Sequence, residues 1–254
     1  MNLAVDIGNT QIKFGLFQED TLIKVFRYPT EEIKSEHLSL FIRSLRKEFP
    51  DIKKGILCSV VQLNHSFLDE IQFLNPLHVF LSSSRINFSN LYASPDSLGL
   101  DRMAAVSGSL VENPSGNSLI INAGTCITYD FINENREYLG GAISPGFGLR
   151  SKALHTFTSK LPLIDLRLIS DTPYMGKTTT ECIQAGIIWA VIHEVKGFIE
   201  QYLSDHPGMK IILAGGDANF LDTHLKNTIF AHQIKWMPDL VLIGLNRILK
   251  IQDA

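Results

Sequence analysis

The first segment that could do chemistry lies at the start of the chain, where an acidic residue precedes a glycine turn and a lysine. Asp6 can hold a hydrated Mg²⁺ through water, because magnesium keeps several of its waters. Gly8, Asn9 and Thr10 can cradle phosphate oxygens, since glycine lets backbone N–H groups approach an anion closely, and Lys13 can neutralise phosphate charge. The segment is not a P-loop, because it lacks G-x-x-x-x-G-K-[ST] and leads into a strand. An ordinary hairpin with a structural aspartate is the alternative.

Two more glycine turns follow predicted strands further along the chain. Residues 123–125 form an Ala-Gly-Thr turn of the phosphate-binding type. Residues 211–214 form an apolar strand that runs into Gly215, Gly216 and Asp217 and then a helix, so an adenine or ribose can lie against the backbone. A tight strand-to-helix turn is the alternative for this segment. Three such turns in one chain indicate a nucleotide held in a cleft between two halves.

The elements that position the first turn follow from hydrophobic periodicity in the first half of the chain. Alternating and continuous apolar runs predict strands, and apolar residues at helical spacing predict helices. The expected strands cover residues 3–5, 12–17, 22–26, 56–61 and 77–81, and the expected helices cover residues 31–49 and 64–73. The strand at 12–17 is expected to be half-buried. This order predicts an α/β layer in which helices pack on a mixed sheet.

The second half repeats the opening pattern. Residues 119–124 match residues 3–8 as strand, polar residue and glycine, so an internal duplication is a plausible interpretation. The densest cluster of chain breakers lies at 113–117, which predicts domains at 1–113 and 114–254. A long helix at 180–203 is apolar over more than one stripe. Core packing and a dimer interface both remain open for it.

Composition excludes several classes of protein. The 254 residues contain 23 Lys and Arg against 26 Asp and Glu, a net charge of −3, which argues against a basic nucleic-acid-binding surface. Hydrophobic residues make up 45% and charged residues 19%, which excludes a disordered chain. The apolar run at 186–192 is too short to span a membrane, and the N-terminus does not read as a signal peptide. Cys58, Cys126 and Cys182 are expected to be reduced packing residues of a cytoplasmic protein.

The order of the glycine turns resembles the superfamily of actin, sugar kinases, acetate kinase and Hsp70. Within it, the sequence resembles type III pantothenate kinase over nearly the whole chain. The specific part is Gly-x-Asp-Arg at 99–102, with a tyrosine seven residues before its glycine. The matching motifs are Asp6-Ile7-Gly8-Asn9-Thr10, Gly99-Leu100-Asp101-Arg102, Ala123-Gly124-Thr125, Gly140-Gly141-Ala142-Ile143-Ser144-Pro145-Gly146 and Ala214-Gly215-Gly216-Asp217-Ala218.

This resemblance implies an actin-like ATPase (ribonuclease H-like) fold of two similar halves, with mixed sheets flanked by helices and the nucleotide in the interdomain cleft. It also implies ATP-dependent phosphorylation of pantothenate, the first step of coenzyme A synthesis, with Mg²⁺, a monovalent cation (K⁺ or NH₄⁺) and a homodimer. Neither nucleic acid nor a membrane is expected as a partner.

The roles of individual residues are carried over from the same resemblance. Asp101 is the implied catalytic base, since the attacking alcohol must lose a proton. Arg102 can grip the substrate carboxylate bidentately or steady the phosphoryl group, and we favour the carboxylate. The residues implied in ATP binding are Asp6, Ile7, Gly8, Asn9, Thr10, Gln11, Ile12, Lys13 and Thr125. The residues implied in pantothenate binding are Tyr92, Gly99, Leu100, Asp101, Arg102 and Thr179.

One position departs from the family pattern. The family's cation-binding acidic residue stands just before the second phosphate turn, and this chain has Asn122 there. An amide offers the monovalent cation only a partial charge, so we expect weak cation binding or none. Two other functions stay open at this point: a phosphohydrolase of the same superfamily and a non-enzymatic regulatory relative.

Overall fold

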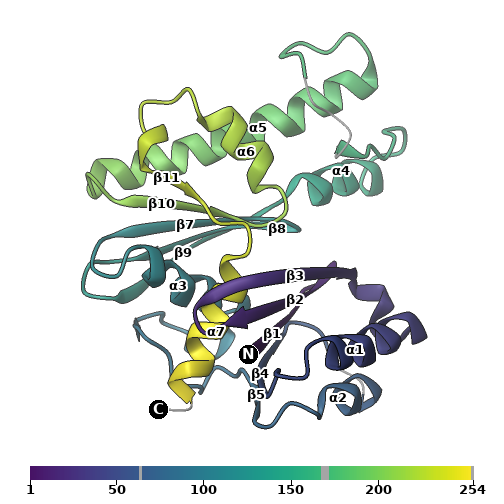
Figure 1. The fold of residues 1–254 in the computed structure, drawn as a ribbon. Helices are drawn as coiled ribbons and strands as arrows, with labels where there is room; N and C mark the ends of the chain where they lie inside the picture. Colours follow the sequence, from purple (N-terminus) through teal and green to yellow (C-terminus); the bar gives the residue numbers. More distant parts are fainter. Residues whose placement is uncertain (63–64, 167–171, 253–254) are drawn as a thin grey trace. The chain divides into compact units, whose positions relative to one another are not determined.

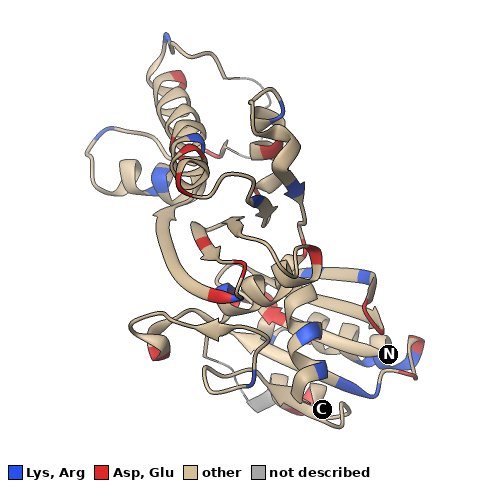
Figure 2. Ribbon diagram, turned by 90° about the vertical axis from the view of Figure 1, so that its left-hand side faces the viewer, with Lys and Arg blue, Asp and Glu red and all other residues tan. Residues whose placement is uncertain are grey.

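The computed structural model describes residues 1–62, 65–166 and 172–252 and divides into two compact units (Figure 1). Unit 1 contains Met1–Ser115, Ile132–Gly140 and Asp239–Ala254, and unit 2 contains Gly116–Phe131 and Gly141–Pro238. The C-terminal segment therefore belongs to the same unit as the N-terminal strands. Lys and Arg are interspersed with Asp and Glu along the described chain (Figure 2).

Unit 1 is built on a five-stranded mixed sheet in the order β3-β2-β1-β4-β5. β1 pairs antiparallel with β2 and parallel with β4, as expected for a hairpin followed by a crossover helix. The strands are β1 Asn2–Ile7, β2 Gln11–Gln18, β3 Thr21–Pro29, β4 Lys54–Ser59 and β5 Leu77–Val79. Their order along the chain confirms the sequence prediction.

Helices cover both faces of this sheet (Figure 1). α1 (Glu36–Glu48) and α2 (His65–Ile71) pack on the face that carries Leu3, Val5 and Ile7. α3 (Leu100–Glu112) and α7 (Leu240–Gln252) pack together, and α7 also contacts β1 and β2. α7 places Leu242 against Gly15 of β2.

Two sequence predictions for unit 1 need correction. The single helix expected over 31–49 is a 3₁₀ turn at Thr30–Lys34 followed by α1, because the side chain of Ser35 caps α1 by accepting from the Leu38 N–H. The strand expected to be half-buried is fully covered at residues 14–17, because α7 lies on its second face.

The second sheet has six strands in the order β11-β10-β7-β8-β9-β6. They are β6 Ser89–Asn90, β7 Ser118–Ala123, β8 Cys126–Ile132, β9 Glu137–Pro145, β10 Lys210–Ala214 and β11 Ile234–Trp236. β6 and the first residues of β9, up to Gly140, belong to unit 1. The helices of unit 2 are α4 Phe147–Thr156, α5 Thr179–Asp205 and α6 Ala218–Leu225.

α5 is a core helix of unit 2. It is the one helix in the described part of the chain that is long and apolar enough to cross a membrane. Its buried residues, among them Ile188 and Val191, pack with Leu119 and Ile121 of β7 in the hydrophobic core. Core packing therefore accounts for the apolar character that the sequence shows over 180–203.

Candidate active site

The turn after β1 is a hairpin whose backbone is held from within unit 1. The Gly8 N–H donates to the Gln11 carbonyl (3.0 Å), and the Thr30 hydroxyl donates to the Gly8 carbonyl (2.8 Å). Asn9 and Thr10 are exposed at its tip, while the side chain of Ile12 is buried in the core. A Cβ on Gly8 would meet the Gln11 oxygen at 3.3 Å, so packing alone leaves almost enough room for a side chain. The hairpin and phosphate-cradle interpretations are compatible.

The other residues of the predicted phosphate-binding segment, 6–13, differ in how exposed their side chains are. Ile7 is fully buried and Gln11 is exposed. Only the backbone of Ile7 and Ile12 is therefore left for a ligand.

Asp6 occupies an unusual electrostatic position. In the β1–β2 register it lies opposite Lys13, and in the β1–β4 register it lies opposite Cys58, so the three side chains share one face of the sheet. Asp6 is only 7% exposed. Burial raises its pKa to about 6; Lys13 acts to lower the pKa, and the nearby carboxylate of Asp101 acts to raise it.

The second carboxylate of the pair comes from the start of α3. Gly99 is the N-cap residue, and Asp101 lies in the first turn with its Oδ1 accepting from the Arg102 N–H (2.9 Å). A Cβ on Gly99 would lie 2.6 Å from that oxygen, so glycine gives the Asp101 carboxylate its space. Burial together with the charges of Asp6 and Asp101 also raises the pKa of the Cys58 thiol well above its usual value. Both carboxylates therefore act on one region of unit 1.

Such a pair fits a hydrated divalent cation. Mg²⁺ is commonly bound by one or two carboxylates that leave several of its waters in place. A cation beside Asp6 would relieve the repulsion from Asp101 and favour the ionised form of a buried carboxylate. Among the described residues no group of three His, Cys, Asp or Glu side chains could hold a metal, so a cage made of protein ligands alone is not present there.

Arg102 is the neighbouring cation and is only 5% exposed. Its Nη2 donates to the hydroxyl of Tyr138 (2.8 Å), and its guanidinium carbon lies 5.8 Å from the ring centroid of Tyr92. The sequence predicted Tyr92 and Arg102 but missed Tyr138. The structure thus brings five residues of unit 1 into a single neighbourhood through pairwise contacts and charge effects: Asp6, Lys13, Tyr92, Asp101 and Arg102.

Unit 2 carries the other predicted turns at the ends of β7 and β10. Gly215 has φ +93°, and a Cβ there would lie 2.1 Å from the Ala123 carbonyl oxygen and 2.7 Å from Oδ1 of Asn122. The Gly146 N–H donates to the Thr125 carbonyl (3.0 Å), and a Cβ on Gly146 would lie 2.0 Å from the Gly124 oxygen. These glycines therefore let the turns of unit 2 pack directly on one another.

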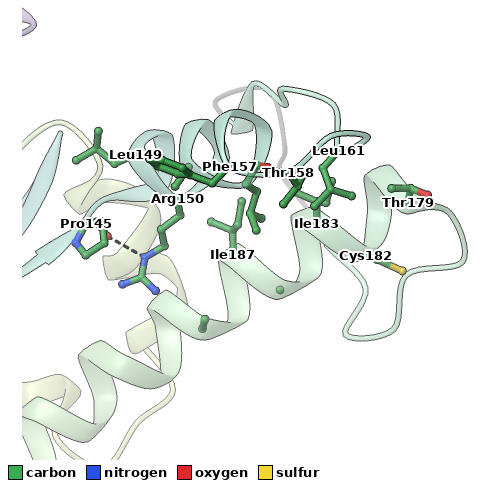
Figure 3. Close-up of a pocket in the computed structure, with 14 residues that line it drawn as sticks. Pro145, Leu149, Arg150, Phe157, Thr158, Leu161, Thr179, Cys182, Ile183 and Ile187 are labelled. Atoms are coloured by element: carbon green, nitrogen blue, oxygen red, sulfur yellow. Dashed lines mark hydrogen bonds between the residues drawn. The ribbon is translucent and has the colours of Figure 1, made fainter.

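Thr179 is the exposed first residue of α5. The adjacent Thr178 caps the helix by accepting from the Glu181 N–H (3.2 Å), and Glu181 accepts from the Lys177 N–H (2.7 Å). Thr179 is also among the residues that line a cavity of about 730 Å³ between α4 and α5 (Figure 3).

Two of the three cysteines differ from the prediction. Cys58 is buried as expected, but Cys126 and Cys182 are exposed. Cys126 is the first residue of β8, beside a turn, and Cys182 lies in the first turn of α5. The apolar residues next to these cysteines in the sequence therefore did not predict their exposure correctly.

Comparison with known proteins identifies the relatives of the chain. Residues 2–201 match the model of the family "Type III pantothenate kinase". The type III pantothenate kinase of Flavobacterium johnsoniae is 42% identical over 235 residues, which cover 91% of this chain and 92% of the relative.

Two solved structures are similar in fold. One is a Campylobacter jejuni protein described as a Baf family transcriptional activator (22% identity, TM-score 0.59, 99% of this chain and 98% of that chain). The other is the inorganic polyphosphate/ATP-glucomannokinase from Arthrobacter sp. strain KM (15% identity, TM-score 0.51, 98% of each chain). The predicted fold class, two mixed sheets flanked by helices in the actin-like arrangement, is confirmed.

Proposed function

The chain belongs to the type III pantothenate kinase family, whose ATP-dependent enzymes phosphorylate pantothenate in coenzyme A synthesis, and from this premise we propose which of its residues perform the reaction. Asp101 is the general base. It takes the proton of the pantothenate hydroxyl as that oxygen forms a bond to the γ-phosphorus and the bond to the β-phosphate oxygen breaks, releasing ADP. The observation that carries this role is the place of the Asp101 carboxylate at the start of α3, close enough to Asp6 to raise its pKa.

The β1–β2 hairpin, residues 6–13, binds the phosphates of ATP, and Thr125 is a further phosphate-binding residue that the family resemblance implies. Asp6 holds Mg²⁺ through water, and Lys13 on the same face of the sheet adds positive charge. When bound, the metal neutralises charge that develops on the transferring phosphoryl group. The chain's own contribution is to orient the phosphates and to keep the Asp6 carboxylate away from bulk water, since Asp6 is only 7% exposed.

Pantothenate binds through residues 99–102, Tyr92 and Thr179. We assign its carboxylate to Arg102, because a guanidinium presents a planar fork of donors that matches a carboxylate. The buried position of Arg102 supports this role, since a charge held away from water interacts more strongly with an opposite charge. Tyr92 packs beside the same guanidinium and shapes the site.

ADP release measured with and without pantothenate tests the function. A kinase requires the alcohol acceptor, so ADP should form only slowly without pantothenate and rise at least a hundredfold when it is added. Equal release in both conditions would indicate a phosphohydrolase. No release in either condition, from folded protein, would indicate a non-enzymatic relative.

The amide of Asn122 allows a test of whether the protein binds a monovalent cation. Its Oδ1 faces the Gly215 turn, and a carboxylate there would add a full negative charge to the oxygens near the phosphate turn. A unit charge about 4 Å from an ion is worth about 4 kcal/mol at an effective dielectric constant of 20, and desolvation offsets much of it. We therefore expect Asn122→Asp to tighten activation by K⁺ or NH₄⁺, and the unaltered protein to respond only at high concentration or not at all.

The measurement for Asn122 is turnover against K⁺ concentration, with ionic strength held constant by a bulky organic cation. Asn122→Gln, which keeps the amide, is the matched control and should not gain sensitivity to K⁺. Saturable activation of the unaltered protein at low K⁺ would refute the prediction and assign the cation to other ligands.

We also propose that the protein is a cytoplasmic homodimer. The groove between α4 and α5 supports this, because Phe157 is 84% exposed and Leu149 is 37% exposed beside it (Figure 3). A second copy of the chain would cover this apolar surface. Light scattering should give twice the chain mass of 28.4 kDa, and Phe157→Glu should shift the molecule toward one chain mass.

A further inference from the structure

We propose that Tyr138 is a positioning residue for Arg102, whose guanidinium it orients for the carboxylate of pantothenate. This inference rests on the role proposed for Arg102 above. Tyr138 lies in β9, has no exposed surface, and accepts a 2.8 Å hydrogen bond from Nη2 of Arg102. The two residues are 36 positions apart, so the bond joins β9 directly to the first turn of α3.

The chemistry of this bond suits an anion-binding arginine. A buried guanidinium has lost water and requires acceptors in fixed directions. A phenol oxygen supplies one of them without a negative charge, so this bond fixes the orientation of the guanidinium but does not neutralise it.

Aromatic packing holds Tyr138 in place. Its ring centroid lies 6.0 Å from that of Tyr92 and 6.2 Å from that of Phe88. Gly140, two residues along β9, has φ +111°, a backbone conformation that favours glycine, and the Tyr92 ring lies beside it, 3.4 Å from where a Cβ would stand. Backbone bonds fix the pairing, since the Leu91 N–H donates to the Tyr138 carbonyl (3.0 Å). The guanidinium of Arg102 thus meets a preformed pair of tyrosines.

Tyr138→Phe tests the inference, because it keeps the ring and removes only the hydroxyl. We expect the KM for pantothenate to rise about tenfold, the KM for ATP to stay unchanged, and kcat to change less than threefold. The matched control is Tyr129→Phe, which removes a buried hydroxyl that donates to Glu194 (2.9 Å) in unit 2 and should leave the KM for pantothenate unchanged. A purely structural role would lower the melting temperature of both variants without separating the two substrates.

The double variant with Arg102→Gln separates this inference from the proposed function. If Tyr138 acts through Arg102, then Tyr138→Phe should add no further rise in the KM for pantothenate once Arg102 is replaced. An unchanged KM in Tyr138→Phe, or effects that multiply in the double variant, would overturn the inference while the role of Arg102 stands. An unchanged KM in Arg102→Gln would overturn both.

Folding is checked by circular dichroism before any kinetic comparison. If phenylalanine proves unstable at 138, 4-fluorophenylalanine fills the space of the hydroxyl with a much weaker acceptor and should shift the KM for pantothenate in the same direction. Calorimetric titration of pantothenate gives the same comparison without turnover, and equal affinities for the unaltered and substituted proteins would again overturn the inference.

Discussion

Asp101→Asn is expected to lower turnover about 10²–10⁴-fold while ATP and pantothenate still bind. The amide keeps the shape of the side chain and keeps an oxygen to accept from the Arg102 N–H, so the start of α3 should not move. The amide cannot take the proton of the attacking alcohol. The charge of Asp101 helps to raise the pKa of Asp6, so its removal leaves Asp6 more readily ionised and should not weaken binding of Mg²⁺ with ATP.

The measurement is steady-state turnover together with calorimetric affinities for both substrates. Asp96→Asn is the matched control, because Asp96 is an exposed carboxylate in the 3₁₀ turn shortly before α3 and should retain full turnover. Near-normal turnover in Asp101→Asn would refute the assignment of Asp101 as the general base. A loss of pantothenate affinity equal to the loss in kcat/KM would instead make Asp101 a binding residue.

The sequence predicted those parts of the site that local chemistry defines. The β1–β2 turn can be recognised in the sequence by an aspartate, a glycine and a lysine within eight residues. The start of α3 can be recognised by Gly99 and Asp101. Both signals are short because a turn and a helix N-terminus are made by neighbours in the chain. Tyr138 was missed because its hydrogen bond joins residues that are 36 apart, and nothing near position 138 marks an acceptor for arginine.

Long-range packing explains the other differences. The strand at 12–17 looked half-buried because Gly15 carries no apolar side chain, yet Leu242 from the last helix covers it. The same helix belongs to unit 1, so residues 239–252 lie with the N-terminal strands, an arrangement that no local pattern near residue 239 indicates. The division at 113/114 and the roles of all the predicted site residues, Asp101 included, stay predictions.

Gly244→Ala should have the largest effect on stability. α3 and α7 cross with their backbones in direct contact: a Cβ on Gly244 would lie 1.7 Å from the Ala104 oxygen, and one on Gly108 would lie 2.5 Å from the Leu240 oxygen. Alanine gains up to about 1 kcal/mol of helix propensity over glycine. Overpacking against backbone costs roughly 3 kcal/mol or more, because neither helix can yield as a flexible side chain would. The steric cost exceeds the gain in helix propensity, so we expect Gly244→Ala to destabilise the protein.

Thermal unfolding and activity measured together test this prediction. Gly197→Ala is the matched control, because Gly197 is an exposed helical glycine of α5 with nothing within 4 Å of a Cβ, so alanine there should raise the melting temperature. Gly244→Ala should lower it by several degrees or prevent folding. Because α3 begins with Asp101 and Arg102, a shift of α3 should also lower turnover in whatever fraction folds. Equal melting temperatures for the two variants would show that the helices separate at little cost, and that the close crossing is not what holds α3 in place.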